Sequence, residues 1–249
     1  MAITAKQERR RKPFIGSSDM AAIMAFDCFH NGYDVWLDKG DKLEPTKENK
    51  VMMRGHYLEP AILNFVEDEL GTLERDPAKL DFIKRQYYLL SHPDALFNGL
   101  PIEAKSQGNY SKEVWGETDT DQVPDRVIIQ CHVHLICTET KVCYVAAYLP
   151  YREFQMFHVL FDCDVAETII EAAQHFWVDH VLKDIPPEDI VPSLAVIKRA
   201  RKSQPISDMP TDLWQQFQLA KTKTKTAKAN QDKAEAELLA EIARRKDLR

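Results

Sequence analysis

The sequence lacks the features that mark several classes of protein. Only 8 of its 249 residues are glycine and 13 are proline, which excludes a collagen-like or low-complexity chain. No apolar run approaches the roughly 18 residues of a membrane span. The basic segment 1–12 is not followed by the apolar core of a secretory signal. We therefore expect a cytoplasmic protein with no membrane partner.

The five cysteines are an odd number and include no Cys-x-x-Cys pair. This spacing does not fit a zinc or iron–sulfur centre, so we expect reduced and mostly buried thiols. The sequence also has no Gly-x-x-x-x-Gly-Lys-Ser/Thr motif, which excludes an ATP-driven motor of the P-loop type.

The net charge of −6 hides an uneven distribution. Residues 1–12 carry +4 and residues 198–228 carry +6, while residues 229–249 are neutral, so residues 13–197 carry −16. This is not the uniformly basic footprint of a simple nucleic-acid binder. An acidic body with basic ends suits an enzyme that gathers carboxylates around a metal and contacts phosphate locally. The same distribution would also serve solubility alone.

Apolar periodicity and turn residues predict an α/β fold. Helices are expected at residues 17–24, 33–39, 57–70, 127–136 and 165–182, and strands at 86–91, 95–97, 100–105, 142–149 and 154–161. Asn98-Gly99 is a strong signal for a hairpin turn. We expect a central mixed β-sheet flanked by helices.

The expected domain boundary lies at a cluster of three prolines, Pro186, Pro187 and Pro192. Residues 1–192 would form one domain, and residues 193–209 a linker. Residues 210–249 have almost no helix breakers and are rich in Ala, Lys, Glu, Gln and Leu. We expect a C-terminal helical extension that serves packing or oligomerisation, with a solvated tail as the alternative.

The chemistry is concentrated in Pro93-Asp94 and, after eight residues, Glu103-Ala104-Lys105. This order is typical of the PD-(D/E)xK nucleases. A hairpin brings Asp94 and Glu103 together, and strand alternation puts Glu103 and Lys105 on one face. Two carboxylates and the Ala104 carbonyl then make a hard oxygen site for Mg²⁺, which Mn²⁺ can replace. Lys105 can orient or deprotonate a water, or stabilise charge on a phosphate. The alternative is a surface hairpin with scattered charges.

Two further groups of residues suit the same chemistry. Glu59, which precedes Pro60, could add a carboxylate to the metal, or simply be an acid in a first helical turn. Arg11 with the Ser17 and Ser18 hydroxyls could clamp a phosphate at a helix start, or the serines could be N-caps.

The order of these motifs resembles the YqaJ-type viral recombinases, phage exonucleases related to the lambda exonuclease. The resemblance covers residues 9–187 and rests on Ile15-Gly16-Ser17-Ser18-Asp19 with Ala21-Ala22-Ile23, Trp36-Leu37-x-Lys39-x-Asp41, Arg54-Gly55-x-x-Leu58-Glu59-Pro60, Pro93-Asp94, Ile102-Glu103-Ala104-Lys105 and Gln130. The chain departs from the family at Val127, where an aromatic is frequent, at His132, which replaces a second glutamine, and at Asp27–Asn31, which lacks a basic residue.

The resemblance implies a restriction-endonuclease-like core and a role for each matching residue. Asp94, Glu103 and the Ala104 carbonyl would hold Mg²⁺, joined by Glu59 directly or through water; Lys105 would activate the attacking water; Gln130 would position the water, the lysine or the DNA strand; Arg11 and Ser18 would grip the 5′-phosphate of a strand end.

The resemblance also implies an activity and its partners. Such enzymes digest one strand of linear double-stranded DNA from its 5′ end and leave a 3′ single-stranded tail for a phage annealing protein. The lambda enzyme is a trimeric ring, so a homo-oligomer in the cytoplasm of a bacterial host cell is expected. Two alternatives are a structure-specific DNA endonuclease of the same superfamily and a catalytically silent adaptor that binds DNA ends.

One further pattern, His132-x-His134, would form a metal pair on a strand. Because the segment is predicted to be helical, side chains two residues apart diverge, and a zinc site is not expected.

Overall fold

The computed structural model describes residues 9–27, 30–44, 49–108, 115–150, 152–187 and 211–246. The chain divides into two compact units, residues 1–201 and 202–249, and each is described by itself. The expected linker 193–209 lies outside the described residues, so the predicted domain boundaries stay predictions.

The elements occur in the following order along the chain. They are β1 (Ile15–Gly16), α2 (Ser17–Ile23), α3 (Gly32–Lys39), α4 (Lys50–Leu70), η1 (Pro77–Lys79), β2 (Phe82–Lys84), η2 (Arg85–Tyr87), β3 (Leu89–Ser91), β4 (Ala95–Phe97), β5 (Leu100–Ser106), α5 (Asp125–Thr138), β6 (Val142–Leu149), β7 (Glu153–Leu160), α6 (Cys163–His175), the π-helical η3 (Phe176–Val181) and α8 (Thr211–Lys246).

A four-stranded mixed sheet has the order β4-β5-β6-β7. The β4–β5 hairpin turns at Asn98 and Gly99, whose φ angles of 49° and 82° are the left-handed values of a two-residue hairpin turn. β5 pairs with β6 in parallel, and β6 pairs with β7 antiparallel. The predicted hairpin and the predicted antiparallel pair are both confirmed.

A second, three-stranded sheet has the order β1-β3-β2. Ile15 of β1 pairs in parallel with Leu89, and Phe82 of β2 pairs antiparallel with Ser91. The sequence predicted one strand over residues 86–91, and this was wrong in its first half. Residues 85–87 form the 3₁₀ turn η2 and Tyr88 has a φ of 58°, so the strand begins only at Leu89.

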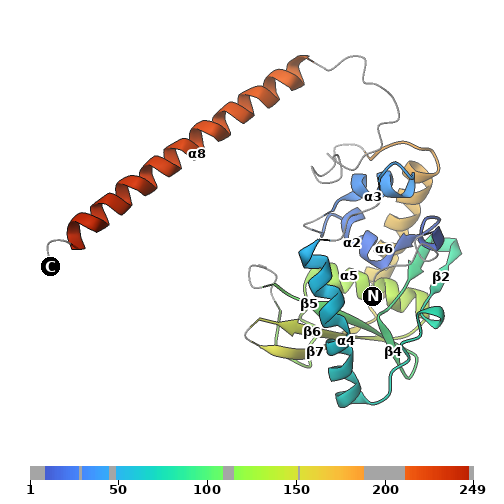
Figure 1. The fold of residues 1–249 in the computed structure, drawn as a ribbon. Helices are drawn as coiled ribbons and strands as arrows, with labels where there is room; N and C mark the ends of the chain where they lie inside the picture. The colour runs from blue at the N-terminus through green and yellow to red at the C-terminus, as the bar shows by residue number, and fades with distance from the viewer. Residues whose placement is uncertain are drawn as a thin grey trace. The chain divides into compact units, whose positions relative to one another are not determined.

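Helices α4 and α5 cover opposite faces of the four-stranded sheet (Figure 1). On the α4 face, Ile62 and Val66 pack against Ile102. On the α5 face, a larger cluster joins the helix to the two long strands, and its buried members are Val127, Cys131, Leu135, Val145, Phe157 and Val159. The mixed α/β architecture flanked by helices is as predicted, and β5 lies enclosed between two helices.

Helix α5 also packs against the other half of the unit. Ile129 and Val133 belong to a buried cluster with Met20 of α2, Leu89 of β3 and Ile169 of α6. Helix α5 therefore contacts both sheets, and its side chains can link them.

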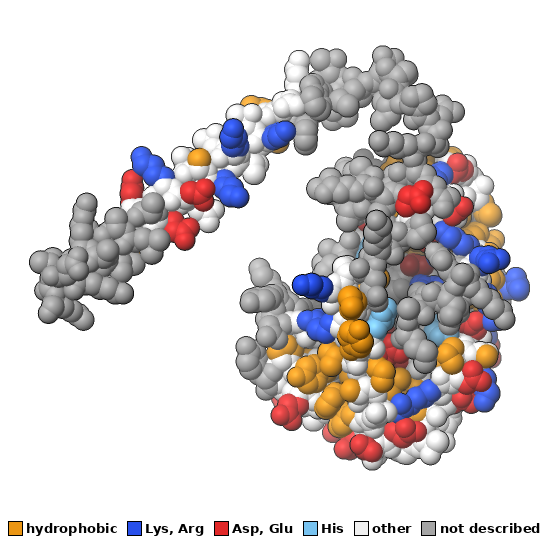
Figure 2. Space-filling model, in the orientation of Figure 1, with side chains coloured by type: hydrophobic (Ala, Val, Ile, Leu, Met, Phe, Trp, Pro, Cys, Tyr) orange, Lys and Arg blue, Asp and Glu red, His pale blue; other side chains and the backbone are white. Residues whose placement is uncertain are grey.

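Helix α4 begins seven residues earlier than the sequence indicated. Asn49 caps it by accepting hydrogen bonds from the N–H groups of Val51 (2.9 Å) and Met52 (3.1 Å). Its first turns are apolar but exposed, with Val51 at 65% and Tyr57 at 75% exposure, and Figure 2 shows apolar side chains gathered over this helix. The buried residues of this helix come only after these exposed turns. The apolar periodicity therefore predicted a helix start that is too late. Pro60 consequently lies inside the helix.

The remaining expectations on helices hold. Helix α3 ends at Gly40, α6 continues into η3 through residue 181, and residues 211–246 form the helix α8. The packing or oligomeric role of α8 stays a prediction.

In the described ranges, no helix combines the length and the apolarity of a membrane span. Among the described cysteines, Cys131, Cys137 and Cys143 are buried and free, as expected.

The start of α2 contains a buried ion pair. Lys39 lies 2.6 Å from Asp19, and its side chain is only 2% exposed. Burial by itself raises the pKa of Asp19, but the charges of Lys39 and Arg11 outweigh it and lower the pKa to about 2. The ion pair therefore stabilises the folded protein wherever Asp19 is ionised in the unfolded chain.

Asp19→Asn is expected to lower the free energy of unfolding by about 2 kcal/mol at pH 7, because it leaves the Lys39 ammonium buried without this carboxylate. The difference from wild type should persist above the unfolded pKa of about 4 and disappear as the pH falls towards 2. Urea unfolding at a series of pH values measures it. Asp179→Asn, which breaks an exposed pair with Lys183, is the control. Equal stabilities at pH 7 would contradict the prediction.

Candidate active site

The β4–β5 hairpin places Asp94 beside β5, just ahead of the first residue of β4. The Asp94 N–H donates to the Ile102 carbonyl at 3.0 Å. The Ala104 N–H donates to the Asp94 carboxylate at 2.7 Å. The N–H and C=O of one strand residue face the same neighbour, so the Ala104 carbonyl is directed to the side of β5 where Asp94 lies.

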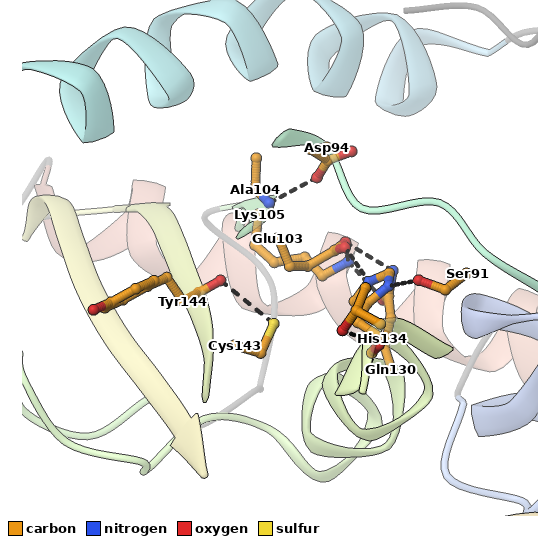
Figure 3. Close-up of polar contacts among 10 residues, drawn as sticks. Ser91, Asp94, Glu103, Ala104, Lys105, Gln130, His134, Cys143 and Tyr144 are labelled. Atoms are coloured by element: carbon orange, nitrogen blue, oxygen red, sulfur yellow. Dashed lines mark hydrogen bonds and ion pairs between the residues drawn. The ribbon is translucent and has the colours of Figure 1, made fainter. Parts of the chain in front are cut away.

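Glu103 is the centre of a polar network (Figure 3). Its Oε1 accepts hydrogen bonds from Lys105 Nζ (2.5 Å) and from Gln130 Nε2 (2.7 Å). Its Oε2 lies 2.8 Å from His134 Nε2. Lys105 Nζ also donates to Gln130 Oε1 at 2.8 Å. The predicted alternation, with Glu103 and Lys105 on one face, is present, and α5 brings Gln130 to both.

The two carboxyl groups have opposite electrostatic environments. Burial by itself raises the pKa of Glu103, but Lys105 and His134 outweigh it and lower the pKa to about 2. The pKa of Asp94 is raised, first by burial and then by repulsion from Glu103, with Lys105 only partly offsetting both. Glu103 is buried and Asp94 is half-buried, and neighbouring carboxyl groups with divergent pKa values are typical of a functional site.

The donor set fits a divalent cation. A cation bound between Asp94 and Glu103 would relieve the repulsion that raises the Asp94 pKa. Carboxylate and carbonyl oxygens are the ligands that Mg²⁺ and Mn²⁺ prefer. Within the described residues, no three His, Cys, Asp or Glu side chains gather closely enough to hold a metal. Asp94 and Ala104 are brought together by the 2.7 Å hydrogen bond from the Ala104 N–H to the Asp94 carboxylate, and Glu103 lies between Ile102 and Ala104 on the same strand. The assignment of Asp94, Glu103 and the Ala104 carbonyl as metal ligands stays a prediction.

Glu59 is not part of that close group. It lies inside α4, not in a first helical turn as its position before Pro60 suggested. Its charge contributes to the raised pKa of Asp94, after burial and Glu103. Glu59 is thus near enough to act on Asp94 electrostatically, and its place in a metal shell stays a prediction.

Ser17 and Ser18 are the first two residues of α2, and Arg11 lies beside the Gly16 that caps it. The Arg11 guanidinium lies so close to Gly16 that a Cβ at that residue would be 2.9 Å from Nη2. Neither serine is the N-cap: the cap residue is Gly16, whose N–H donates to Asp19 at 2.9 Å. Ser17 is buried and Ser18 is exposed. The phosphate-binding assignment stays a prediction.

Two residues of the network were missed by sequence reasoning, His134 and Ser91. His134 Nδ1 lies 2.6 Å from Ser91 Oγ. His134 is four residues after Gln130, a spacing that places both on one face of α5, and this spacing could have identified it. His132 points elsewhere, as expected, and contacts the Ile128 carbonyl and the Asp162 N–H.

Two sequence comparisons with known proteins identify the family of the chain. The family model of the YqaJ-like viral recombinase domain matches residues 7–141, more than half of the chain. The chain is 22% identical over 177 residues to the uncharacterized protein YqaJ of Bacillus subtilis (strain 168). That match covers 69% of this chain and 54% of the relative, so the chain spans about half the length of the curated protein it matches.

Solved structures of exonucleases share the fold. The alkaline exonuclease LHK-Exo from Laribacter hongkongensis superposes with a TM-score of 0.54 at 18% identity, over 73% of this chain and 94% of that one. LHK-Exo in complex with dAMP gives 0.55 over the same shares. A phage related exonuclease from Haemophilus somnus 129PT gives 0.51 at 11% identity, over 69% and 96%. The resemblance read from the motifs is confirmed: the chain belongs to the YqaJ-like viral recombinase family.

Proposed function

We propose that this protein is a Mg²⁺-dependent exonuclease that digests one strand of linear double-stranded DNA in the 5′ to 3′ direction. The 3′ single-stranded tail would serve phage-type recombination through a single-strand annealing protein in a bacterial cytoplasm. The observation that carries the proposal is the convergence of Asp94, Glu103, Lys105 and Gln130 on one partly buried site. Membership of a recombinase family adds the biological setting.

The metal would be held by Asp94, Glu103 and the Ala104 carbonyl, with Glu59 nearby. When bound, it supplies Lewis-acid activation of a water and stabilises charge on the phosphate. Lys105 Nζ has three hydrogens, of which Glu103 and Gln130 take two. The third remains for the attacking water or for a phosphate oxygen.

Gln130 holds Lys105 in place for that task. Its Oε1 accepts from Lys105, and its Nε2 donates to Glu103. The amide therefore fixes both charged groups at once. The exposed Ser18 and the Arg11 guanidinium would hold the 5′-phosphate, since a guanidinium binds phosphate with two parallel hydrogen bonds.

The test uses a linear duplex with one labelled 5′-phosphorylated end and one blocked end, in the presence of Mg²⁺. Release of labelled mononucleotide from the open 5′ end, with a covalently closed circle left intact, is the expected result. A ring-shaped oligomer would further show as processive digestion of one duplex at a time.

Other outcomes separate the alternatives. Cleavage of the closed circle would replace the proposal with a structure-specific endonuclease. Binding to the duplex end without any cleavage would replace it with a DNA-end adaptor. Digestion from the 3′ end would retain the nuclease and reverse its direction.

A further inference from the structure

A buried chain of hydrogen bonds reaches Glu103 from the other sheet. Ser91 lies on β3 of the three-stranded sheet, His134 on α5, and Glu103 on β5 of the four-stranded sheet. Ser91 and His134 are completely buried and Glu103 is 4% exposed. The links are 2.6 Å from Ser91 Oγ to His134 Nδ1 and 2.8 Å from His134 Nε2 to Glu103 Oε2 (Figure 3).

The chemistry of these groups fixes the direction of the hydrogen bond to Glu103. An ionised carboxylate only accepts hydrogen bonds, so His134 Nε2 carries the hydrogen that Glu103 receives. In the neutral imidazole, Nδ1 is then an acceptor and takes the Ser91 hydroxyl hydrogen. In the imidazolium, Nδ1 instead donates to Ser91 Oγ, because the hydroxyl can donate or accept. In both states Ser91 holds the Nδ1 side of the ring, and Nε2 is left to donate to Glu103.

The network also gives the two oxygens of Glu103 different partners. Oε2 is held by His134, while Oε1 is shared by Lys105 and Gln130. A carboxylate held at both oxygens cannot rotate freely. Removing His134 would leave Oε2 buried without this donor, which costs free energy and allows the group to turn.

His132 shows that α5 can bury a histidine without contacting the site. It is 2% exposed, and within the described part of the chain its ring nitrogens contact two backbone groups, the Ile128 carbonyl and the Asp162 N–H. Burial of a histidine in α5 therefore does not by itself require a contact with Glu103. The two histidines form a matched pair, one joined to the site and one not.

We propose that Ser91 and His134 are positioning residues that hold the Glu103 carboxylate in the orientation required to bind the divalent metal. This inference rests on the proposed metal-dependent function. Partners of metal-binding carboxylates typically change metal affinity by about 10- to 100-fold when they are removed.

The experiment titrates the full-length protein with Mn²⁺, without DNA, and measures free Mn²⁺ by its electron paramagnetic resonance signal. His134→Leu is expected to weaken Mn²⁺ binding by about 10- to 100-fold. His134→Gln, which retains an N–H donor near the Nε2 position, should recover most of the affinity. Ser91→Ala should weaken binding less than His134→Leu, and His132→Leu should bind as wild type does. Near-UV circular dichroism reports whether each variant is folded.

Each other result decides against the inference. A folded His134→Leu with wild-type affinity overturns it and leaves the nuclease proposal standing, and so does an equal loss in His132→Leu. If His134→Leu does not fold, Ser91→Ala decides, and wild-type affinity in that variant overturns the inference. A wild-type protein that binds no Mn²⁺ contradicts the metal-dependent function itself.

Discussion

Lys105→Ala is expected to lower the rate of DNA-end digestion by roughly 10²- to 10⁴-fold. Lys105 is the cation of the network, and its Nζ lies within 2.8 Å of both Glu103 Oε1 and Gln130 Oε1. Under the proposed function, its loss would remove the group that orients or deprotonates the attacking water. Single-turnover release of labelled mononucleotide from a 5′-phosphorylated duplex measures the effect.

The affinity of Lys105→Ala for metal should not fall with its rate of digestion. The Lys105 charge lowers the pKa of Glu103 and acts against a second cation nearby. Lys105→Ala is therefore expected to bind Mn²⁺ at least as tightly as wild type while it digests DNA far more slowly. Lys183→Ala, an exposed lysine paired with Asp179, is the control and should digest DNA normally. Near-wild-type activity in Lys105→Ala would refute the assigned role.

Lys105→Arg separates the two roles that the lysine can play. Arginine keeps the positive charge, but it does not give up a proton in proteins. If Lys105 accepts a proton from water, the Arg variant should be as slow as Lys105→Ala. If Lys105 only stabilises charge on the phosphate, Lys105→Arg should retain substantial activity.

The site was predictable wherever local rules determined the geometry. Asn98-Gly99 specified the hairpin, and strand alternation specified that Glu103 and Lys105 share a face. Each of these rules acts over a few residues of one hairpin, so tertiary packing could not override it.

The sequence could not predict the parts that depend on packing between distant elements. The Ser91–His134–Glu103 chain joins β3, α5 and β5. The spacing from Gln130 could have placed His134 on the site face of α5, but no local pattern predicts its contact with Ser91 on the other sheet. Likewise, the exposed apolar residues at the start of α4 carry no burial period, so the helix appeared to start at Tyr57. The resemblance to a family suggested a role for Gln130, and a 5′-phosphate as the ligand of Arg11, that periodicity alone would not have given.

Asp94→Asn is expected to slow digestion by roughly 10³-fold and yet to raise the melting temperature of the metal-free protein. Burial and Glu103 raise the pKa of Asp94, so its ionised form destabilises the fold near neutral pH. Asparagine removes that charge and keeps an oxygen to accept the Ala104 N–H. Each kcal/mol gained should raise the melting temperature by about 2–4 °C. Loss of a metal ligand worth about 4 kcal/mol to the transition state corresponds to a rate loss of roughly 10³-fold.

Added Mg²⁺ should reverse the order of stability of wild type and Asp94→Asn, and pH should change the size of the difference without metal. Mg²⁺ at 100 times its dissociation constant stabilises a protein that binds it by about 2.7 kcal/mol, so wild type should become more stable than Asp94→Asn when Mg²⁺ is added.

Without metal, the folded state of wild type favours protonated Asp94. The advantage of the variant should therefore be absent below the unfolded pKa of about 4 and grow as the pH rises through the folded pKa. Calorimetric melting with and without Mg²⁺ measures both effects, with exposed Asp68→Asn on α4 as the control. Two results would contradict the prediction. A variant less stable than wild type without metal would show that ionised Asp94 does not destabilise the fold. A variant that Mg²⁺ stabilises as much as wild type would show that Asp94 does not bind the metal.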